Sequence, residues 1–245
     1  MHNFNERLSL AATAHKGYKA GGAGVRVATS ETYQYDPEYT NSYELALRSV
    51  SLSGDSVFNV NAYHTNWSDM QVVVIPPGGP NNDFTIENAG SSTLYGLEVG
   101  FSQVVNDSFN FFANAAYSKT EYDKYVTNGA DYAGNSFVFA PELMASIGLE
   151  YAFTDNWVLS ADANYQSEAE GHHSNVDNMK VPARTLVNAK FGYEANNWSA
   201  SIYSRNLTNE QYVTQYLVDS AGTGAGENVK VGTPMFVGLQ VDVEL

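Results

Sequence analysis

The final stretch of the chain reads Met235-Phe236-Val237-Gly238-Leu239-Gln240-Val241-Asp242-Val243-Glu244-Leu245. Its odd-numbered positions are all apolar, whereas its even-numbered positions are small or polar apart from Phe236. Because successive side chains of a β-strand point to opposite faces, this alternation predicts a strand with one face toward lipid and the other toward water. A strand of about ten residues with this pattern is typical of an outer-membrane β-barrel.

The same alternation recurs along nearly the whole chain. Such runs exceed the five or six residues that are usual for strands of globular proteins, and aromatic residues mark several strand ends, as expected of interfacial girdles. We therefore predict an all-β fold, an antiparallel transmembrane β-barrel, over a soluble β-sandwich or β-solenoid, which also alternates. Ten amphipathic runs cover residues 4–18, 38–53, 55–73, 83–104, 108–124, 137–153, 157–170, 180–195, 198–213 and 229–245.

The connectors between these runs alternate in length. Short connectors rich in Gly, Asn and Asp favour tight hairpins. They occur at Ser53-Gly54-Asp55, Val105-Asn106-Asp107, Thr154-Asp155-Asn156 and Asn196-Asn197. Longer connectors lie at about residues 19–37, 74–82, 125–136, 171–179 and 214–228. Short periplasmic turns and long extracellular loops are the layout of outer-membrane barrels. If the last strand ends in the periplasm, a count of ten strands makes the first strand start there too.

Composition agrees with a barrel and excludes several other classes. Only 16% of the 245 residues are charged, while 17 Tyr and 12 Phe raise the aromatic share to 13%. Mean hydropathy is −0.31 and no run of about 18 apolar residues exists, so no transmembrane helix is expected; a polar lumen face lowers the hydropathy of a barrel. A net charge of −15 argues against nucleic-acid binding. The lack of cysteine removes disulfides and thiolate chemistry.

Five segments resemble a known family, and they occur in that family's order. They are His15-Lys16-Gly17-Tyr18-Lys19-Ala20-Gly21-Gly22; Asp36-Pro37-Glu38 leading into Asn41-Ser42-Tyr43-Glu44-Leu45-Ala46-Leu47-Arg48; Asn88-Ala89-Gly90 before Tyr95-Gly96-Leu97-Glu98; Phe139-Ala140-Pro141-Glu142; and Arg205-Asn206-Leu207-Thr208-Asn209-Glu210-Gln211-Tyr212. Together they resemble the barrel of TonB-dependent outer-membrane receptors, which import ferric siderophores, cobalamin and some glycans. The resemblance spans almost the whole chain and implies the bacterial outer membrane as its location.

The resemblance also implies a domain organisation. Full receptors carry a signal peptide, a TonB box, a plug and about 22 strands around a plugged lumen. None of the first three is visible, so residues 1–245 are expected to be the C-terminal β-barrel segment, without plug or signal peptide. Its expected partners are outer-membrane lipid, the missing N-terminal barrel strands and plug, and TonB through that plug. The chain departs from the family by ending in Leu245 instead of an aromatic residue.

Two groups of residues are candidates for binding. Stacking on an aromatic or sugar ligand at the barrel mouth is one interpretation of five loop tyrosines, and packing within girdles and loops is the other. These tyrosines are Tyr33, Tyr35, Tyr122, Tyr125 and Tyr132. A second group could hold a divalent metal through carboxylate and imidazole groups: Glu168, Glu170, His172, His173 and Asp177. It lacks a fixed ligand spacing, so we expect no metal site, with His172 and His173 as weak candidates only.

Five scattered histidines support no Ser-His-Asp arrangement, so neither an enzyme nor a cofactor is expected. The leading functional hypothesis is a receptor segment for TonB-dependent uptake of a small molecule such as a ferric siderophore, cobalamin or glycan. The alternative is a self-contained small barrel that acts as a passive pore or structural protein. A plug-coding region upstream in the same reading frame would favour the receptor.

Overall fold

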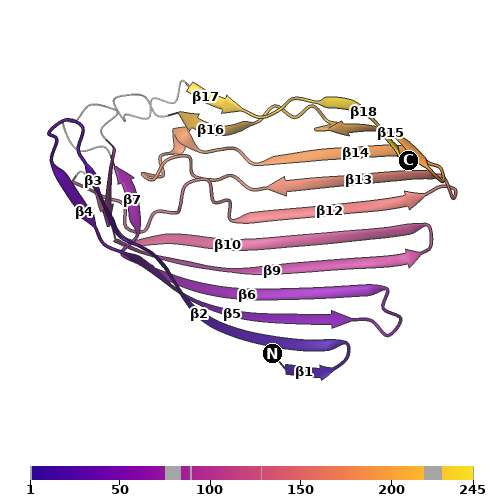
Figure 1. The fold of residues 1–245 in the computed structure, drawn as a ribbon, viewed down its shortest axis with the longest axis horizontal. Helices are drawn as coiled ribbons and strands as arrows, with labels where there is room; N and C mark the ends of the chain where they lie inside the picture. The colour runs from indigo at the N-terminus through magenta and orange to yellow at the C-terminus, as the bar shows by residue number, and fades with distance from the viewer. Residues whose placement is uncertain (1, 75–83, 89, 128, 218–227, 245) are drawn as a thin grey trace.

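The computed structural model of the chain describes residues 2–74, 84–88, 90–127, 129–217 and 228–244. One antiparallel sheet dominates it, with the order β1-β2-β5-β6-β9-β10-β12-β13-β14-β15-β18 (Figure 1). The long strands are β2 (Leu8–Lys19), β5 (Glu38–Val50), β6 (Ser56–Ser68), β9 (Gly90–Asn106), β10 (Phe109–Thr127), β12 (Leu143–Ala152), β13 (Trp157–Gln166), β14 (Arg184–Glu194), β15 (Trp198–Arg205) and β18 (Phe236–Val243).

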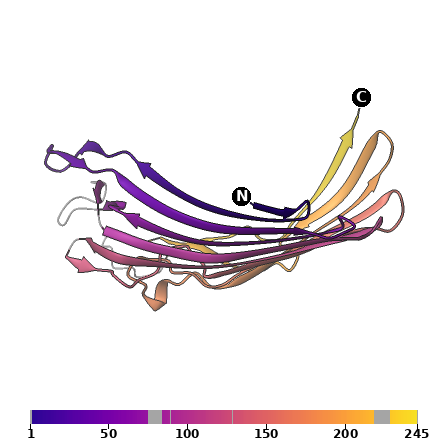
Figure 2. The ribbon, with the colours of Figure 1, turned by 90° about the horizontal axis from the view of Figure 1, so that it is seen from below.

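The sheet is a single curved layer, shaped like a trough (Figure 2). A β-sandwich would bury one face of this sheet against a second one. Instead, the buried hydrophobic residues of the described chain lie mainly in and beside the long connectors: Met70, Val74, Tyr122, Tyr125, Ala169, Met179 and Val181. Within the described residues, no helix is long and apolar enough to cross a membrane. The all-β antiparallel prediction is confirmed.

Each of the ten predicted runs contains one long strand. The runs 55–73, 83–104 and 229–245 also include most of the short strands β7 (Gln71–Val74), β8 (Thr85–Asn88) and β17 (Asn228–Val231), and the run 4–18 differs at its start. The run 4–18 contains a hairpin, because β1 (His2–Asn5) pairs with β2 and adds a further strand at the edge of the sheet. The Asn5 Oδ1 atom accepts hydrogen bonds from the backbone N–H groups of Arg7 and Leu8, at 2.8 and 2.9 Å. This side-chain-stabilised turn interrupts a stretch whose alternation alone indicates one strand.

The connectors separate by length as predicted. The four short turns lie at one end of the strands, and the long connectors lie at the other (Figure 1). The long connectors carry β3 (Gly22–Val25) paired with β4 (Thr32–Tyr35), β7 (Gln71–Val74) with β8 (Thr85–Asn88), β16 (Val213–Leu217) with β17 (Asn228–Val231), β11 (Ala130–Asp131) beside β10, and the 3₁₀-helix η1 (Asp177–Met179). Most of the predicted loops 74–82 and 214–228, and Leu245, lie outside the described residues.

The register separates the side chains into two faces. Ile147 pairs with Ala113 and Ala163, whereas its neighbour Ser146 pairs with Asn114 and Asn164. The first set belongs to an apolar face and the second to a polar one. Ile147 is 57% exposed on the apolar face, in a sheet with no second layer to cover it. This arrangement fits a wall with lipid on its outer side and water on its inner side.

Candidate functional site: the polar wall and the loop cluster

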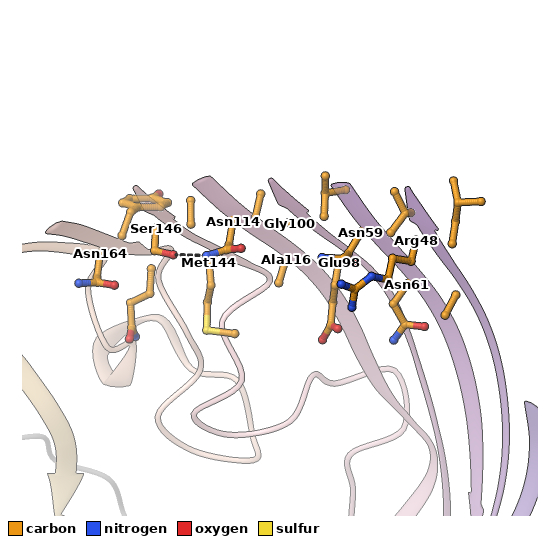
Figure 3. Close-up of a pocket in the computed structure, with 18 of the residues that line it drawn as sticks. Arg48, Asn59, Asn61, Glu98, Gly100, Asn114, Ala116, Met144, Ser146 and Asn164 are labelled. Atoms are coloured by element: carbon orange, nitrogen blue, oxygen red, sulfur yellow. Dashed lines mark hydrogen bonds between the residues drawn. The ribbon is translucent and has the colours of Figure 1, made fainter. Parts of the chain in front are cut away.

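Two rows of cross-strand partners build the polar wall of the trough. The row nearer the long loops consists of Ala11, Ala46, Asn61, Glu98, Ala116, Met144, Gln166 and Arg184. The row nearer the short turns consists of Ser9, Arg48, Asn59, Gly100, Asn114, Ser146, Asn164 and Leu186. These residues line a hollow of about 740 Å³ (Figure 3).

Short side chains and amides give this hollow its chemistry. Gly100, Ala116 and Ser146 carry little or no side chain, so the wall recedes at these positions. The Asn114 Nδ2 group donates a hydrogen bond to Ser146 Oγ at 3.2 Å, and Asn61 Oδ1 is buried without a partner among the described residues (Figure 3). The wall therefore offers neutral hydrogen-bonding groups to whatever lies inside the trough.

Few charges line the hollow. Arg48 and Glu98 contribute one charge of each sign. Arg184 is engaged elsewhere, because its guanidinium lies 4.9 Å from the ring centre of Tyr212 and donates to the carbonyl of Val213 at 3.3 Å. No sequence motif marks this hollow as a site, although the polar parity of the strands carries the necessary signal.

Aromatic rings lie over glycines on the neighbouring strands beside the hollow. A methyl group added at Gly96 would meet the Tyr63 ring, and one added at Gly148 would meet the Phe112 ring. The Tyr63 hydroxyl also donates a hydrogen bond to Ser118 Oγ at 3.0 Å. Each glycine thus provides the room in which a large ring lies flat on the sheet, which stabilises the strand pairing.

The predicted tyrosines separate into two places. Tyr33 and Tyr35 lie on β4, where their rings cover Gly24 and Gly22 of β3 and their centroids are 6.4 Å apart. The Tyr33 hydroxyl accepts a hydrogen bond from the Ile86 N–H at 3.3 Å, which joins the β3–β4 hairpin to β8. These two tyrosines therefore pack within the hairpins at the loop end.

The other three tyrosines form one cluster. Tyr122 and Tyr125 of β10 are only 7% and 5% exposed and pack with Met70. Ring centroids are 4.8 Å apart for Tyr122 and Tyr125, and 5.3 Å for Tyr125 and Tyr132. Trp67, Val72 and Phe137 pack around them. The structure thus brings together three of the five predicted tyrosines; their role in ligand binding stays a prediction.

The candidate metal group is divided by the fold. Its three carboxylates surround the Lys180 Nζ atom, at 3.4 Å from Glu168, 3.8 Å from Glu170 and 3.4 Å from Asp177. The hydrogen bond to Asp177, followed by the charge of Glu168, raises the pKa of the Lys180 ammonium. The three carboxylates therefore share one lysine ammonium group and do not join the two histidines.

The histidines pack against the tyrosine cluster. The rings of His172 and His173 are 3.9 Å apart, and His172 Nδ1 lies 2.6 Å from Ser174 Oγ. Burial, followed by repulsion from His172, lowers the pKa of His173 to about 4, and burial also lowers the pKa of His172. Among the residues that the structure describes, no three His, Asp or Glu side chains converge in a geometry suited to a metal ion.

One antiparallel layer, with an apolar outer face, a polar inner face, short turns at one end and long loops at the other, defines part of the wall of a transmembrane β-barrel. The family model for the TonB dependent receptor-like β-barrel matches residues 1–207, so the chain belongs to this family. TonB-dependent receptors are proteins of the bacterial outer membrane, which confirms the predicted location. They are receptors and transporters, so the family also supports the prediction that the chain is no enzyme.

Individual relatives agree with this family. The chain is 23% identical over 220 residues to the probable TonB-dependent siderophore receptor PiuA of Acinetobacter baumannii. The aligned region covers 85% of this chain and 28% of PiuA. The crystal structure of the ferric yersiniabactin uptake receptor FyuA from Yersinia pestis matches with a TM-score of 0.81 at 19% identity, covering 98% of this chain and 35% of FyuA. The crystal structure of PiuA matches with a TM-score of 0.76 at 18% identity, covering 98% of this chain and 34% of PiuA. The chain therefore spans about a third of the length of these relatives.

Proposed function

We propose that this chain forms part of an outer-membrane receptor that imports a ferric siderophore with energy delivered by TonB. The family match over residues 1–207 carries the proposal. By their names, PiuA is a siderophore receptor and FyuA is a ferric yersiniabactin uptake receptor. The curated relative and both structures cover at least 85% of this chain. The chemistry of the chain is compatible with this role, because the inner wall is polar and almost neutral where a hydrophilic metal chelate would pass.

The proposal includes a place for the chain in the whole receptor. Residues 1–245 would be the C-terminal part of a barrel of about 22 strands. Further strands would pair with the outer edges of β1 and β18, each of which has one partner among the described strands. A plug contributed by another part of the receptor would fill the trough and contact TonB. This arrangement satisfies the backbone groups of both edges, which lipid cannot do.

The alternative is a small barrel closed by this chain alone, acting as a passive pore. The relatives do not favour it, because they are about three times as long as the region that matches. In the described strands the sheet ends at β1 and β18, and these two strands do not pair with each other.

The experiment that tests the proposal is uptake of radioactive iron by cells that produce the full-length receptor. Cells with and without the receptor, each with and without TonB, receive ferric complexes of a hydroxamate, a catecholate and citrate. We expect at least one complex to enter only when both the receptor and TonB are present. Uptake of none of the ferric complexes contradicts the siderophore proposal, and entry that persists without TonB supports the passive pore instead.

A further inference from the structure

A groove lies on the apolar face of the sheet, across β2, β5 and β6, and has a volume of about 520 Å³. Two rows of cross-strand partners line it from this face: Ala12, Leu45 and Ala62, and, nearer the long loops, Ala14, Tyr43 and His64. Each residue of the first row adjoins a residue of the polar wall in the sequence, so its side chain points to the apolar face. The groove therefore opens toward the lipid side of the wall.

Three alanines make the floor of this groove, and larger side chains rise beside them. Tyr43 and Leu45 of β5 are 55% and 50% exposed on the apolar face. The His64 ring of β6 stacks on the Tyr95 ring of β9, with centroids 6.4 Å apart and an interplanar angle of 11°, and is thereby held at one side of the groove. A flexible hydrocarbon chain can follow such a recess and supply the dispersion contacts that its lining lacks.

A cation and two amides lie at the end of the groove that is nearer the long loops. Lys16, Asn41 and Asn66 form the next row of cross-strand partners in that direction. Lys16 lies two residues beyond Ala14 on β2, which is about 7 Å along the strand. Its Nζ atom is 4.6 Å from the centre of the Tyr39 ring, and both asparagines are exposed. This row therefore suits a charged and hydroxylated head group.

No salt bridge in the described part of the chain involves the ammonium group of Lys16. The carboxylates of Glu38 and Glu44 point to the polar face, because they share the parity of that face on β5. The row of Lys16 continues to Glu121 of β10, four strands away. That separation is about 19 Å, which exceeds the screening length of about 8 Å at physiological ionic strength. The ammonium group is therefore available to an anion on the lipid side.

We propose that this groove is a binding site for a phosphorylated glycolipid of the membrane leaflet on the side of the long loops. One acyl chain lies in the groove, and the lipid phosphate pairs with Lys16. Sugar hydroxyls bond to the side-chain amides of Asn41 and Asn66, which both donate and accept hydrogen bonds. The site goes beyond the proposed function, because it rests on the membrane location of the family and not on the ligand that is imported.

The test measures the affinity of lipid A, a phosphorylated glycolipid, for the purified full-length receptor in non-ionic detergent by native mass spectrometry. Lys16→Gln removes the cation and should weaken binding about fivefold. Lys190→Gln is the matched control, because Lys190 pairs with Ser160 on the polar face, and its affinity should equal that of the unaltered receptor. Lipid A without its phosphates should bind to the unaltered receptor and to Lys16→Gln with the same affinity.

A second substitution tests the groove itself. Ala14→Trp fills it with an indole and should weaken the binding of lipid A about tenfold, as though about two methylene groups had been withdrawn from it. Ala113→Trp places the same indole on the apolar face of β10, outside the groove, and should leave the affinity unchanged.

Equal affinities of Lys16→Gln and Lys190→Gln, or of the two tryptophan variants, overturn the proposal. Phosphatidylglycerol that binds as tightly as lipid A, with the same sensitivity to Lys16→Gln, would assign the groove to a phospholipid instead. A receptor dimer that Ala14→Trp separates, at unchanged affinity for lipid A, would assign it to a second copy of the chain. None of these measurements needs iron, so a failure of iron uptake alongside the expected affinities counts against the proposed function alone.

Discussion

At the scale of single residues, the parity of each strand assigns neighbouring side chains to different solvents. Ile147 belongs to the apolar face and pairs with Ala113 and Ala163. Ser146, one residue earlier, faces the hollow and accepts a hydrogen bond from Asn114. This assignment was readable from the sequence because strand geometry alone sends adjacent side chains to opposite faces.

Arginine substitutions at this pair test the assignment. Ile147→Arg should lower the free energy of unfolding of the receptor in lipid by about 2–4 kcal/mol, because a cation near the bilayer midplane loses its hydration. Ser146→Arg is the matched control and should cost much less, since its guanidinium reaches the watery side. Denaturant unfolding in lipid vesicles gives both values. Equal losses in the two variants would contradict the two-faced wall.

The surroundings of the two histidines could not be predicted from the sequence. His172 and His173 lie close in sequence to three acidic residues, which made a metal site worth considering. Chain proximity did not decide their surroundings, because Lys180 attracts the carboxylates and the imidazoles pack on tyrosines of another connector. Only the docking of two connectors, far apart in the sequence, places His173 beside Tyr125 and Tyr132.

Residues 168–181 dock onto residues 135–139, where Asn135 Nδ2 donates to the His173 carbonyl at 2.9 Å and the Phe139 N–H donates to the Glu170 carbonyl at 2.8 Å. This docking should depend on pH. The pKa of His173 is lowered to about 4 when docked, against 6.5 for the ordinary imidazole, so protonation favours the undocked state. Docking is therefore fully stable above pH 6.5 and weakens as the pH falls from 6.5 toward 4. We expect the docking equilibrium to fall by about tenfold or more between pH 7 and pH 4.5.

Hydrogen exchange of the amides at residues 170–175, corrected for intrinsic rates, measures this change. His173→Gln keeps a polar side chain that does not titrate, so its protection should vary much less over the same range. Protection of the unaltered receptor that is independent of pH would show that His173 does not control the docking.

At the scale of elements, one asparagine joins the end of β15 to the segment that enters β18. Asn206 is 4% exposed and has a positive φ of 50°, a conformation that asparagine tolerates better than most residues. Its side chain accepts from the Glu210 N–H at 2.8 Å and donates to the carbonyls of Glu210 and Thr233, at 2.9 and 3.1 Å. Three backbone groups of an irregular connector thus depend on a single amide.

Removal of this amide should destabilise the wall. Asn206→Ala removes three partly buried hydrogen bonds to backbone groups and should lower the free energy of unfolding by about 1–3 kcal/mol. Asn206→Asp turns a carboxylate oxygen, in place of the donor, toward the carbonyls of Glu210 and Thr233, so its loss should be at least as large as that of Asn206→Ala. Denaturant midpoints of the folded receptor in detergent compare the two. A clearly smaller loss for Asn206→Asp would contradict the importance of the two donated hydrogen bonds.

The element pattern was largely predictable, with a physical reason for each miss. The ten long strands and the alternation of short and long connectors follow from local rules of side-chain direction and turn chemistry. The hairpin at Asn5 was missed because its turn lies inside an alternating run. The hairpin β3–β4 was predicted only as a loop, and β7 and β8 only as parts of the runs 55–73 and 83–104. These short strands are held partly by contacts between the hairpins, as through Tyr33 and Ile86.

At the scale of the whole molecule, the receptor proposal makes the hollow a part of the import route. Ala116 and Ala115 are adjacent on β10 and point to opposite faces. Ala116→Trp would fill the hollow with an indole, so we expect it to slow the uptake of the ferric chelate while the chelate still binds at the loops. Ala115→Trp, its matched control, places the indole in lipid and should leave uptake unchanged.

Parallel measurements of ligand affinity and of iron uptake in cells separate these outcomes. Uptake by Ala116→Trp at the rate of the unaltered receptor would exclude this part of the wall from the route. A fall in affinity as large as the fall in uptake would mean that the substitution damages binding instead of passage.

The sequence by itself determined the strands, their two faces and the family, because these depend on the alternation of neighbouring side chains and on short segments read in order. Tertiary structure alone decided which residues meet: the two rows that line the hollow, the lysine among three carboxylates, and the histidine that packs against two tyrosines. The physical reason is that a strand's faces are a local property of the backbone. Register and loop docking, in contrast, are set by contacts between segments that are distant in the chain.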